Sequence, residues 1–200
     1  MKKNIPQILL LSRLGFACTI VLLSFISISY EKTIVLCMLY LGIFSDIFDG
    51  IFARKQNTSS RQFRINDTII DLVFYLSIAY FIYSFNPTII TDNLKFIIGI
   101  LGLEALMYLI SFVRFRQFPS PHDILSKFWA IYLLIEFTLL LIGFDGIHFT
   151  IALSIGLLIH AQRVLIYVIL KHWEHDIPSV YHAFLLRKGI KIKRRKLFNG

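Results

Sequence analysis

The chain has 200 residues, of which 56% are hydrophobic and 16% charged, and its formal net charge is +9. Soluble domains are usually no more than about half apolar and about one quarter charged, so this composition excludes an ordinary soluble domain. The long unbroken apolar runs also exclude a transmembrane β-barrel, whose strands alternate over short segments, and they predict an all-α integral membrane protein.

The positive charge does not by itself indicate nucleic-acid binding, because the cytoplasmic loops of membrane proteins are enriched in lysine and arginine. We therefore expect no nucleic-acid partner. Cys18 and Cys37 both fall inside apolar runs. Two such cysteines make no disulfide framework, and we interpret them as small buried hydrophobic residues.

The apolar runs and their breaks divide the chain into elements of one predicted membrane domain, residues 1–200. Residues 1–13 look like an interfacial helix, because Lys2, Lys3 and Arg13 flank an apolar face. Each later run is near the ~20 residues that cross a bilayer, and Asn86-Pro87 breaks the third run. The six expected spans cover about residues 14–30, 33–53, 68–85, 94–113, 128–144 and 147–170, and a basic cytoplasmic tail follows over residues 171–200.

The positions of lysine and arginine near the span ends predict the orientation in the membrane. One side holds only Lys32 and Lys95, whereas the other holds the basic residues of both termini and of the 54–64 and 114–127 connections. This asymmetry predicts a multi-pass protein of the inner or cell membrane with both termini in the cytoplasm.

Four carboxylates lie where the second and third spans approach their short basic connection. Asp46 and Asp49 are three residues apart, and Asp67 and Asp71 are four apart, so each pair lies on one face of a helix. If the two faces meet, four like charges gather in one place, and they cannot all stay ionised without cations between them. Oxygen-only ligation favours a hard divalent ion, Mg²⁺ or Mn²⁺.

Further ionisable side chains occur inside the predicted spans. Glu104, Glu136 and Arg163 lie, like Asp46 and Asp71, roughly 10 to 15 Å below the expected cytoplasmic edge, at ~1.5 Å per residue. A polar cavity open to the cytoplasm would explain this layer, since charge at membrane depth is costly. The alternative for two of them is an internal ion pair between Glu136 and Arg163.

Small residues accompany the acids of the second span. Gly42, Asp46, Asp49, Gly50 and Ala53 form a single helical stripe. Such a stripe permits close helix packing, and because aspartates are interleaved with the small residues, we expect a ligand site there.

This stretch resembles the CDP-alcohol phosphatidyltransferase family, whose signature is D-x2-D-G-x2-A-R-x8-G-x3-D-x3-D. Phe63 stands where the family has glycine. The opening N-I-P-x-x-L-x-x-S-R, over residues 4–13, is also similar to the family. The residues that match the signature in type and spacing are Asp46, Asp49, Gly50, Ala53, Arg54, Asp67 and Asp71.

The resemblance implies a phospholipid-synthesising transferase with two divalent metal ions. Asp46, Asp49 and Asp67 would hold the ions, helped by Asp71, which would also act as general base on the acceptor hydroxyl. The acceptor oxygen would attack the β-phosphorus of a CDP-alcohol, usually CDP-diacylglycerol, and CMP would leave. Homodimers are common in the family.

The resemblance also implies which residues contact the donor and the acceptor. The expected CDP contacts are Asp46, Gly50, Ala53, Arg54 and Ser60. A phosphorylated acceptor needs a second basic cluster; the candidates are Arg61, Arg64, Arg114, Arg116 and Lys127, which ordinary positive-inside charge would explain equally well. Glycerol 3-phosphate is the favoured acceptor, and serine remains open.

Three other readings stay open beside this one. A membrane prenyltransferase also uses aspartates and magnesium on a lipid diphosphate, but it has two Asp-rich loops and more spans. A small transporter with a cation site would show two related halves, and no such repeat is visible. An inactive family member, blocked by Phe63, is the third. Metal-dependent release of CMP would distinguish an active enzyme from the last two.

Overall fold

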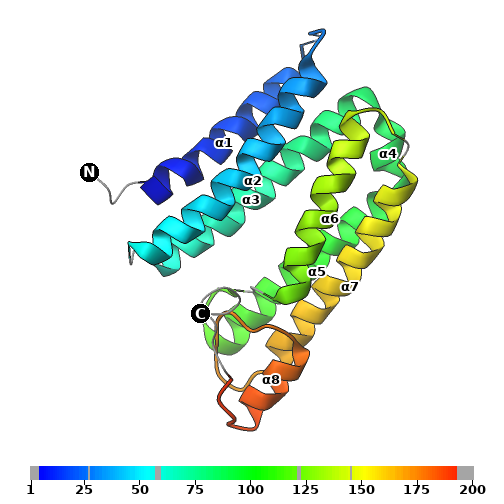
Figure 1. Ribbon diagram of the computed structural model, residues 1–200. Coiled ribbons are helices and arrows are strands. Elements are labelled where there is room, and N and C mark those ends of the chain that lie inside the picture. The colour runs from blue at the N-terminus through cyan, green and yellow to red at the C-terminus, as the bar shows by residue number, and fades with distance from the viewer. Residues whose placement is uncertain (1–4, 27, 57–59, 121–122, 145, 193–200) are drawn as a thin grey trace. The chain divides into compact units, whose positions relative to one another are not determined.

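The computed structural model describes residues 5–26, 28–56, 60–120, 123–144 and 146–192, without the side chains of Arg54 and Arg61. Within these ranges all regular secondary structure is helical, which confirms the predicted fold class (Figure 1). The helices are α1 (Ile5–Leu23), α2 (Glu31–Lys55), α3 (Arg61–Phe85), α4 (Pro87–Asp92), α5 (Leu94–Phe115), α6 (Ile124–Leu141), α7 (Ile147–Ile169) and α8 (Val180–Arg187).

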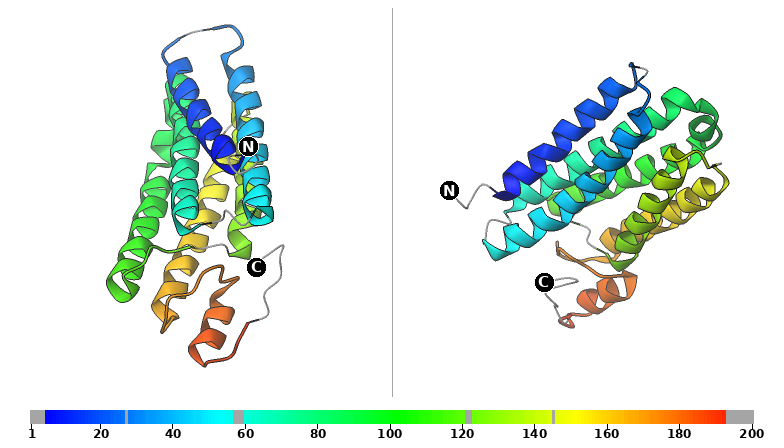
Figure 2. Two further views of the ribbon diagram at one scale, coloured as in Figure 1. Left: turned by 90° about the vertical axis from the view of Figure 1, so that its left-hand side faces the viewer. Right: turned by 45° about the horizontal axis from the view of Figure 1, so that its top comes forward.

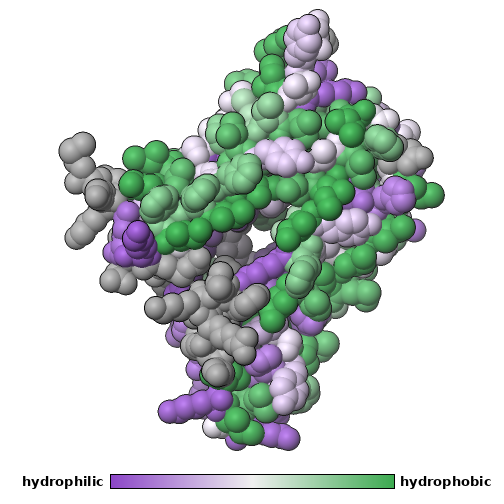
Figure 3. All heavy atoms as spheres, viewed as in Figure 1, coloured by the Kyte–Doolittle hydropathy of each residue, from purple (hydrophilic) through white to green (hydrophobic). Residues whose placement is uncertain are grey.

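Six of the described helices, α1, α2, α3, α5, α6 and α7, are long and apolar enough to cross a membrane. Large hydrophobic side chains are exposed along them, for example Leu22 and Leu158. Figure 3 shows such side chains over α1 and α2. Cys18 and Cys37 are exposed on these helices, so their predicted burial is wrong. A membrane explains this surface, because exposed apolar patches of such extent are rare on soluble monomers.

The first span differs from its prediction. The expected interfacial helix over residues 1–13 and the span at 14–30 are, from Ile5 onward, one continuous helix that ends at Leu23. Arg13, which was expected to lie at the membrane surface, is only 1% exposed. The charge does not end the span, because acidic side chains from other helices neutralise it inside the protein.

The other five spans are confirmed apart from their ends. The largest shift is at α3, which begins seven residues before the predicted start at residue 68. Ser60 starts this helix as its N-cap, since its hydroxyl accepts a hydrogen bond from the Phe63 amide at 3.1 Å. The helix ends before Pro87, which disfavours helical geometry in the residue ahead of it.

The chain forms two compact units. Unit 1 comprises residues 1–91 and 137–145, and in it α1 packs along both α2 and α3 (Figures 1 and 2). Its core includes Ile20, Leu39 and Ile78, none of which is exposed. The Phe74 ring of α3 reaches α2 at Gly42, where a Cβ atom would lie 2.3 Å from the end of this ring.

Unit 2 comprises residues 92–136 and 146–200, and in it α5 and α8 pack against α7. Met107 and Tyr167 are buried in its core, and the Tyr167 hydroxyl accepts a hydrogen bond from the Ser120 amide at 2.8 Å. The predicted tail therefore begins with a folded segment, since α8 buries Ala183 and Arg187 donates to the Ile169 carbonyl at 3.1 Å.

Candidate active site

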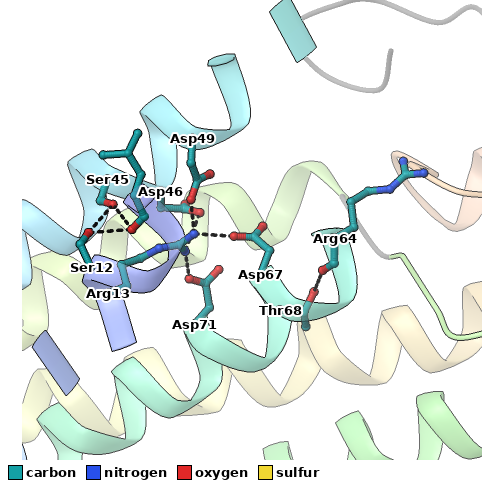
Figure 4. A network of polar contacts seen from close by, with 10 residues as sticks. Ser12, Arg13, Ser45, Asp46, Asp49, Arg64, Asp67, Thr68 and Asp71 are labelled. Carbon is teal, nitrogen blue, oxygen red and sulfur yellow. Dashed lines mark hydrogen bonds and ion pairs between the residues drawn. The ribbon is translucent and has the colours of Figure 1, made fainter. Parts of the chain in front are cut away.

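The guanidinium of Arg13 lies at the centre of four carboxylates in unit 1. Its Nη1 donates to Asp46 Oδ1 at 2.9 Å and to Asp71, and its Nη2 donates to Asp49 and Asp67. Figure 4 shows the aspartates projecting toward Arg13 from α2 and α3, while Arg13 comes from α1. Three helices therefore meet at one polar cluster, which we call the acidic cluster: Asp46, Asp49, Asp67 and Asp71.

The acidic cluster forms because of the spacing of its members along two helices. Residues three or four apart lie on the same face of a helix, so each of α2 and α3 contributes two neighbouring carboxylates. The structure thus brings together the four aspartates that the sequence grouped. It adds Arg13, to which sequence analysis gave no role in the site, although the S-R of the N-terminal opening contained it.

Burial is uneven across the acidic cluster. The Asp49 side chain is only 1% exposed, those of Asp67 and Asp71 are 20% and 31% exposed, and that of Asp46 is 46% exposed. The cluster therefore has a closed end at Asp49 and an open end at Asp46, from which a charged molecule could reach it.

The acidic cluster fits a divalent cation by three criteria. Among the described side chains, four carboxylates surround one guanidinium, which leaves three negative charges in excess if all four are ionised. Ligand oxygens of Asp46, Asp49 and Asp67 all lie within 4.8 Å of one another. Asp49 Oδ1 is buried and has no hydrogen-bond partner, which is costly for a carboxylate unless a cation meets it. Oxygen-only donors of this kind suit Mg²⁺ or Mn²⁺.

Two serines fasten α1 to α2 beside the acidic cluster. Ser12 and Ser45 both donate to the Leu9 carbonyl, at 2.6 and 2.7 Å, and their hydroxyl oxygens lie 3.2 Å apart (Figure 4). These bonds fix the position of Arg13, the residue after Ser12, relative to α2. Like Arg13, Ser12 belongs to the N-terminal opening quoted above.

A comparison with models of known protein families identifies the family of the chain. The family model for CDP-alcohol phosphatidyltransferases matches residues 3–171, which include α1, the acidic cluster and all six spans. The chain belongs to the CDP-alcohol phosphatidyltransferase family. It is thus a membrane transferase that moves a phosphatidyl group from a CDP-alcohol, as the 46–71 signature predicted. Comparisons with curated proteins and with solved structures gave no match.

The remaining signature residues of this phosphatidyltransferase lie close to the acidic cluster in sequence. Gly50 is half-buried and Ala53 is buried, while the Arg54 side chain lies outside the described residues. Ser60 caps α3 and also borders a hollow of about 190 Å³. Phe63, at the family's glycine position, borders the same hollow. The other residues that line it are Pro6, Gln7, Leu10, Gln62 and Asn66.

The five basic residues suggested for a phosphorylated acceptor have different surroundings. The Arg61 side chain lies outside the described residues, and that of Arg64 extends away from the acidic cluster (Figure 4). Arg114 donates to the carbonyls of Tyr167, Val168 and Leu170, at the end of α7. Arg116, which ends α5 with a positive φ of 53°, and Lys127 are exposed.

A second charged cluster lies in unit 2 of the transferase. Arg163 Nε donates to Asp123 Oδ2 at 2.9 Å, and its Nη1 lies 3.4 Å from Glu104 Oε2. The pair between Glu136 and Arg163, which sequence analysis gave as the alternative to a polar cavity, is therefore wrong. Asp123, just before α6, is the partner of Arg163 instead of Glu136. Its Oδ1 also accepts a hydrogen bond from the Ser126 amide at 2.9 Å.

Proposed function

We propose that this chain is an active phosphatidyltransferase that uses CDP-diacylglycerol as its donor, with glycerol 3-phosphate as the favoured acceptor and serine as the alternative. The observation that carries the proposal is the acidic cluster, in which four carboxylates surround one guanidinium among the described side chains and a buried Asp49 oxygen has no hydrogen-bond partner. A cluster that only stabilised the fold would need less excess negative charge, as in unit 2, where Arg163 faces two carboxylates rather than four.

In this proposal the acidic cluster holds two divalent ions, Mg²⁺ or Mn²⁺. Asp46, Asp49 and Asp67 are the main ligands, and Asp71 assists them. When bound, the ions neutralise the diphosphate of the donor and stabilise the charge that develops on the leaving oxygen. The partial exposure of Asp46 supports entry of the diphosphate from the open end of the cluster.

Asp71 is the proposed general base. It lies one turn after Asp67 on α3, and its side chain is 31% exposed, so an acceptor hydroxyl can approach it. The acceptor oxygen forms a bond to the β-phosphorus, the bond from that phosphorus to the CMP oxygen breaks, and the hydroxyl proton passes to Asp71. Positioning and charge neutralisation account for most of the catalysis in such a transfer.

The nucleotide of the donor is proposed to contact Asp46, Gly50, Ala53, Arg54 and Ser60. The hollow beside Ser60 supports this placement, because it opens next to the start of α3. Phe63 leaves less room for the nucleotide in this hollow than the glycine of the family would. For the acceptor, Arg64, Arg116 and Lys127 remain proposals, as does Arg61, whereas Arg114 already serves the end of α7.

The membrane orientation belongs to the same proposal. The excess of lysine and arginine on one side supports a site that faces the cytoplasm, where CDP-linked donors and small phosphorylated alcohols meet the membrane surface. We propose the cell membrane, one membrane domain and, by family resemblance, a homodimer.

The test is an assay of the purified full-length protein in detergent micelles with CDP-diacylglycerol, Mg²⁺ and either labelled glycerol 3-phosphate or labelled serine. We expect release of CMP together with one labelled lipid, and neither product with Asp71→Asn. Cation binding without CMP release would instead favour the non-catalytic alternative. Absence of a labelled lipid from the wild-type protein with every acceptor would refute the proposal.

A further inference from the structure

The hydrogen bonds of the Arg13 guanidinium indicate more than a buried structural charge. All four hydrogen bonds of its guanidinium go to the acidic cluster, one to each carboxylate. Its Nε is buried and has no hydrogen-bond partner. The guanidinium is therefore held in place by the four aspartates and by no other polar group among the described residues.

The same carboxylates are the proposed metal ligands, so Arg13 and the metal would bind the same oxygens. Asp46 Oδ1, Asp49 Oδ2 and Asp67 Oδ1 accept from Arg13. Repulsion between a guanidinium and a divalent ion within a few ångströms is worth several kcal/mol even at the effective dielectric constant of about 20 that suits protein sites. The two cations cannot both make their best contacts with one set of oxygens.

We propose that Arg13 is a built-in counter-ion that competes with divalent metal for the acidic cluster and gives up its carboxylate bonds when metal binds. The arginine holds the four carboxylates together in the metal-free protein, where their mutual repulsion would otherwise push α2 and α3 apart. The unpaired Asp49 Oδ1, at the closed end, is an oxygen that Arg13 leaves open for the incoming ion. The inference rests on the proposed metal site and adds a residue that competes with the metal for it.

Competition and a purely structural role predict opposite changes in metal affinity when Arg13 is removed. If Arg13 only positioned the carboxylates for metal, its removal would weaken metal binding, because the ligands would lose their arrangement. If it competes, removal strengthens binding and at the same time destabilises the metal-free protein. Affinity and metal-free stability then move in opposite directions.

The experiment measures Mn²⁺ binding to the full-length protein in detergent micelles, after metal is stripped with EDTA and the chelator is removed. Electron paramagnetic resonance of free Mn²⁺ gives the Kd. For Arg13→Gln we expect the Kd to fall about tenfold or more, as expected from the loss of one neighbouring positive charge. The melting temperature of the stripped variant should fall, and Mn²⁺ should raise it by more than it raises that of the wild type.

Arg13→Lys provides a second variant in case Arg13→Gln does not fold without metal. An ammonium keeps the charge but has three donors and no planar fork, so it cannot bond to all four carboxylates at once. Its Kd should lie between those of wild type and Arg13→Gln. Arg163→Gln is the matched control, because it removes the other arginine that pairs with two carboxylates, and its Kd should equal that of wild type.

The results separate this inference from the proposed function. If wild type binds Mn²⁺ but Arg13→Gln, or failing that Arg13→Lys, binds it equally or more weakly, competition by Arg13 is refuted and the metal site stands. If neither wild type nor the Arg13 variants bind Mn²⁺, the metal site itself is refuted, and the competition with it. Asp49→Asn shows that the titrated site is the acidic cluster, since it should lose most of its affinity.

Discussion

Among the described side chains, each unit has an arginine that pairs with several carboxylates, and the ratio of charges differs between the two units. In unit 1, Arg13 faces four aspartates, and Asp49 Oδ1 has no partner. In unit 2, the carboxylates that Arg163 pairs with in the described part of the chain are Asp123 and Glu104, and both oxygens of Asp123 accept hydrogen bonds. The excess of negative charge in the first cluster is what the proposed metal site requires, whereas the second cluster resembles an ion pair that stabilises the fold.

The largest expected effect concerns the closed end of the first cluster. Asp49→Asn removes the negative charge of a proposed ligand and replaces one of its two oxygens by an amide nitrogen. CMP release should therefore fall about a thousandfold or more, as when one residue is lost from a catalytic site whose residues act together. Asp123→Asn, the counterpart in unit 2, should leave the Mn²⁺ Kd unchanged. An Asp49→Asn variant with near-normal turnover would show that the imbalance has no catalytic meaning.

The second cluster is broken by Arg163→Met. Because Asp123 is fully buried and Glu104 largely so, removal of Arg163 leaves both carboxylates inside the protein without their shared cation. Asp123 keeps the Ser126 amide as a partner, and Glu104 keeps His160, whose Nε2 lies 3.5 Å from its Oε2. The loss of stability should be about 3–5 kcal/mol, measured by unfolding in detergent. The double variant Arg163→Met with Glu104→Gln should recover part of it. A single variant as stable as wild type would contradict a structural role for this ion pair.

Removal of metal should affect only the first cluster. With Mg²⁺ at about one hundred times its Kd, each bound ion stabilises the protein by about 2.7 kcal/mol, and EDTA should remove this gain together with CMP release. Arg163→Met should lose the same increment on addition of EDTA, since its defect lies elsewhere. Thermal unfolding with and without chelator measures both increments. An equal stability with and without chelator in wild type would argue against a bound cation.

Much of the fold could be predicted because hydropathy is a local property. Five spans and the break before Pro87 follow from runs of apolar residues, and the acid pairs follow from helical spacing. The first span was misplaced because Arg13 was taken for a surface charge. Its partners are 33 to 58 residues away in the chain, and no local pattern shows such neutralisation. The same limit hid Asp123 as the partner of Arg163.

Two glycines, one in each unit, pack against aromatic rings, and their replacement should have a smaller effect on stability. In Gly42→Ala the new Cβ would lie 2.3 Å from the buried Phe74 ring, and in Gly156→Ala it would lie 2.4 Å from Trp129, whose Nε1 is bound to the Ala152 carbonyl. Each should cost about 1–3 kcal/mol. Gly15→Ala is the control, because its Cβ meets nothing within 4 Å, and it should be neutral or slightly stabilising. Equal stability of all three variants would mean that these rings can move aside.

The smallest expected effect is at Ser60, where a structural role and a proposed donor contact meet in one hydroxyl. Ser60→Ala removes the acceptor for the Phe63 amide and should cost about 1 kcal/mol, whereas Ser60→Asn keeps a capping oxygen and should not. If the hydroxyl also contacts the donor, both variants should raise the KM for CDP-diacylglycerol, although only the first loses stability. If the KM follows stability instead, the hydroxyl acts through the start of α3 alone, and the donor contact must be assigned to other residues of the signature.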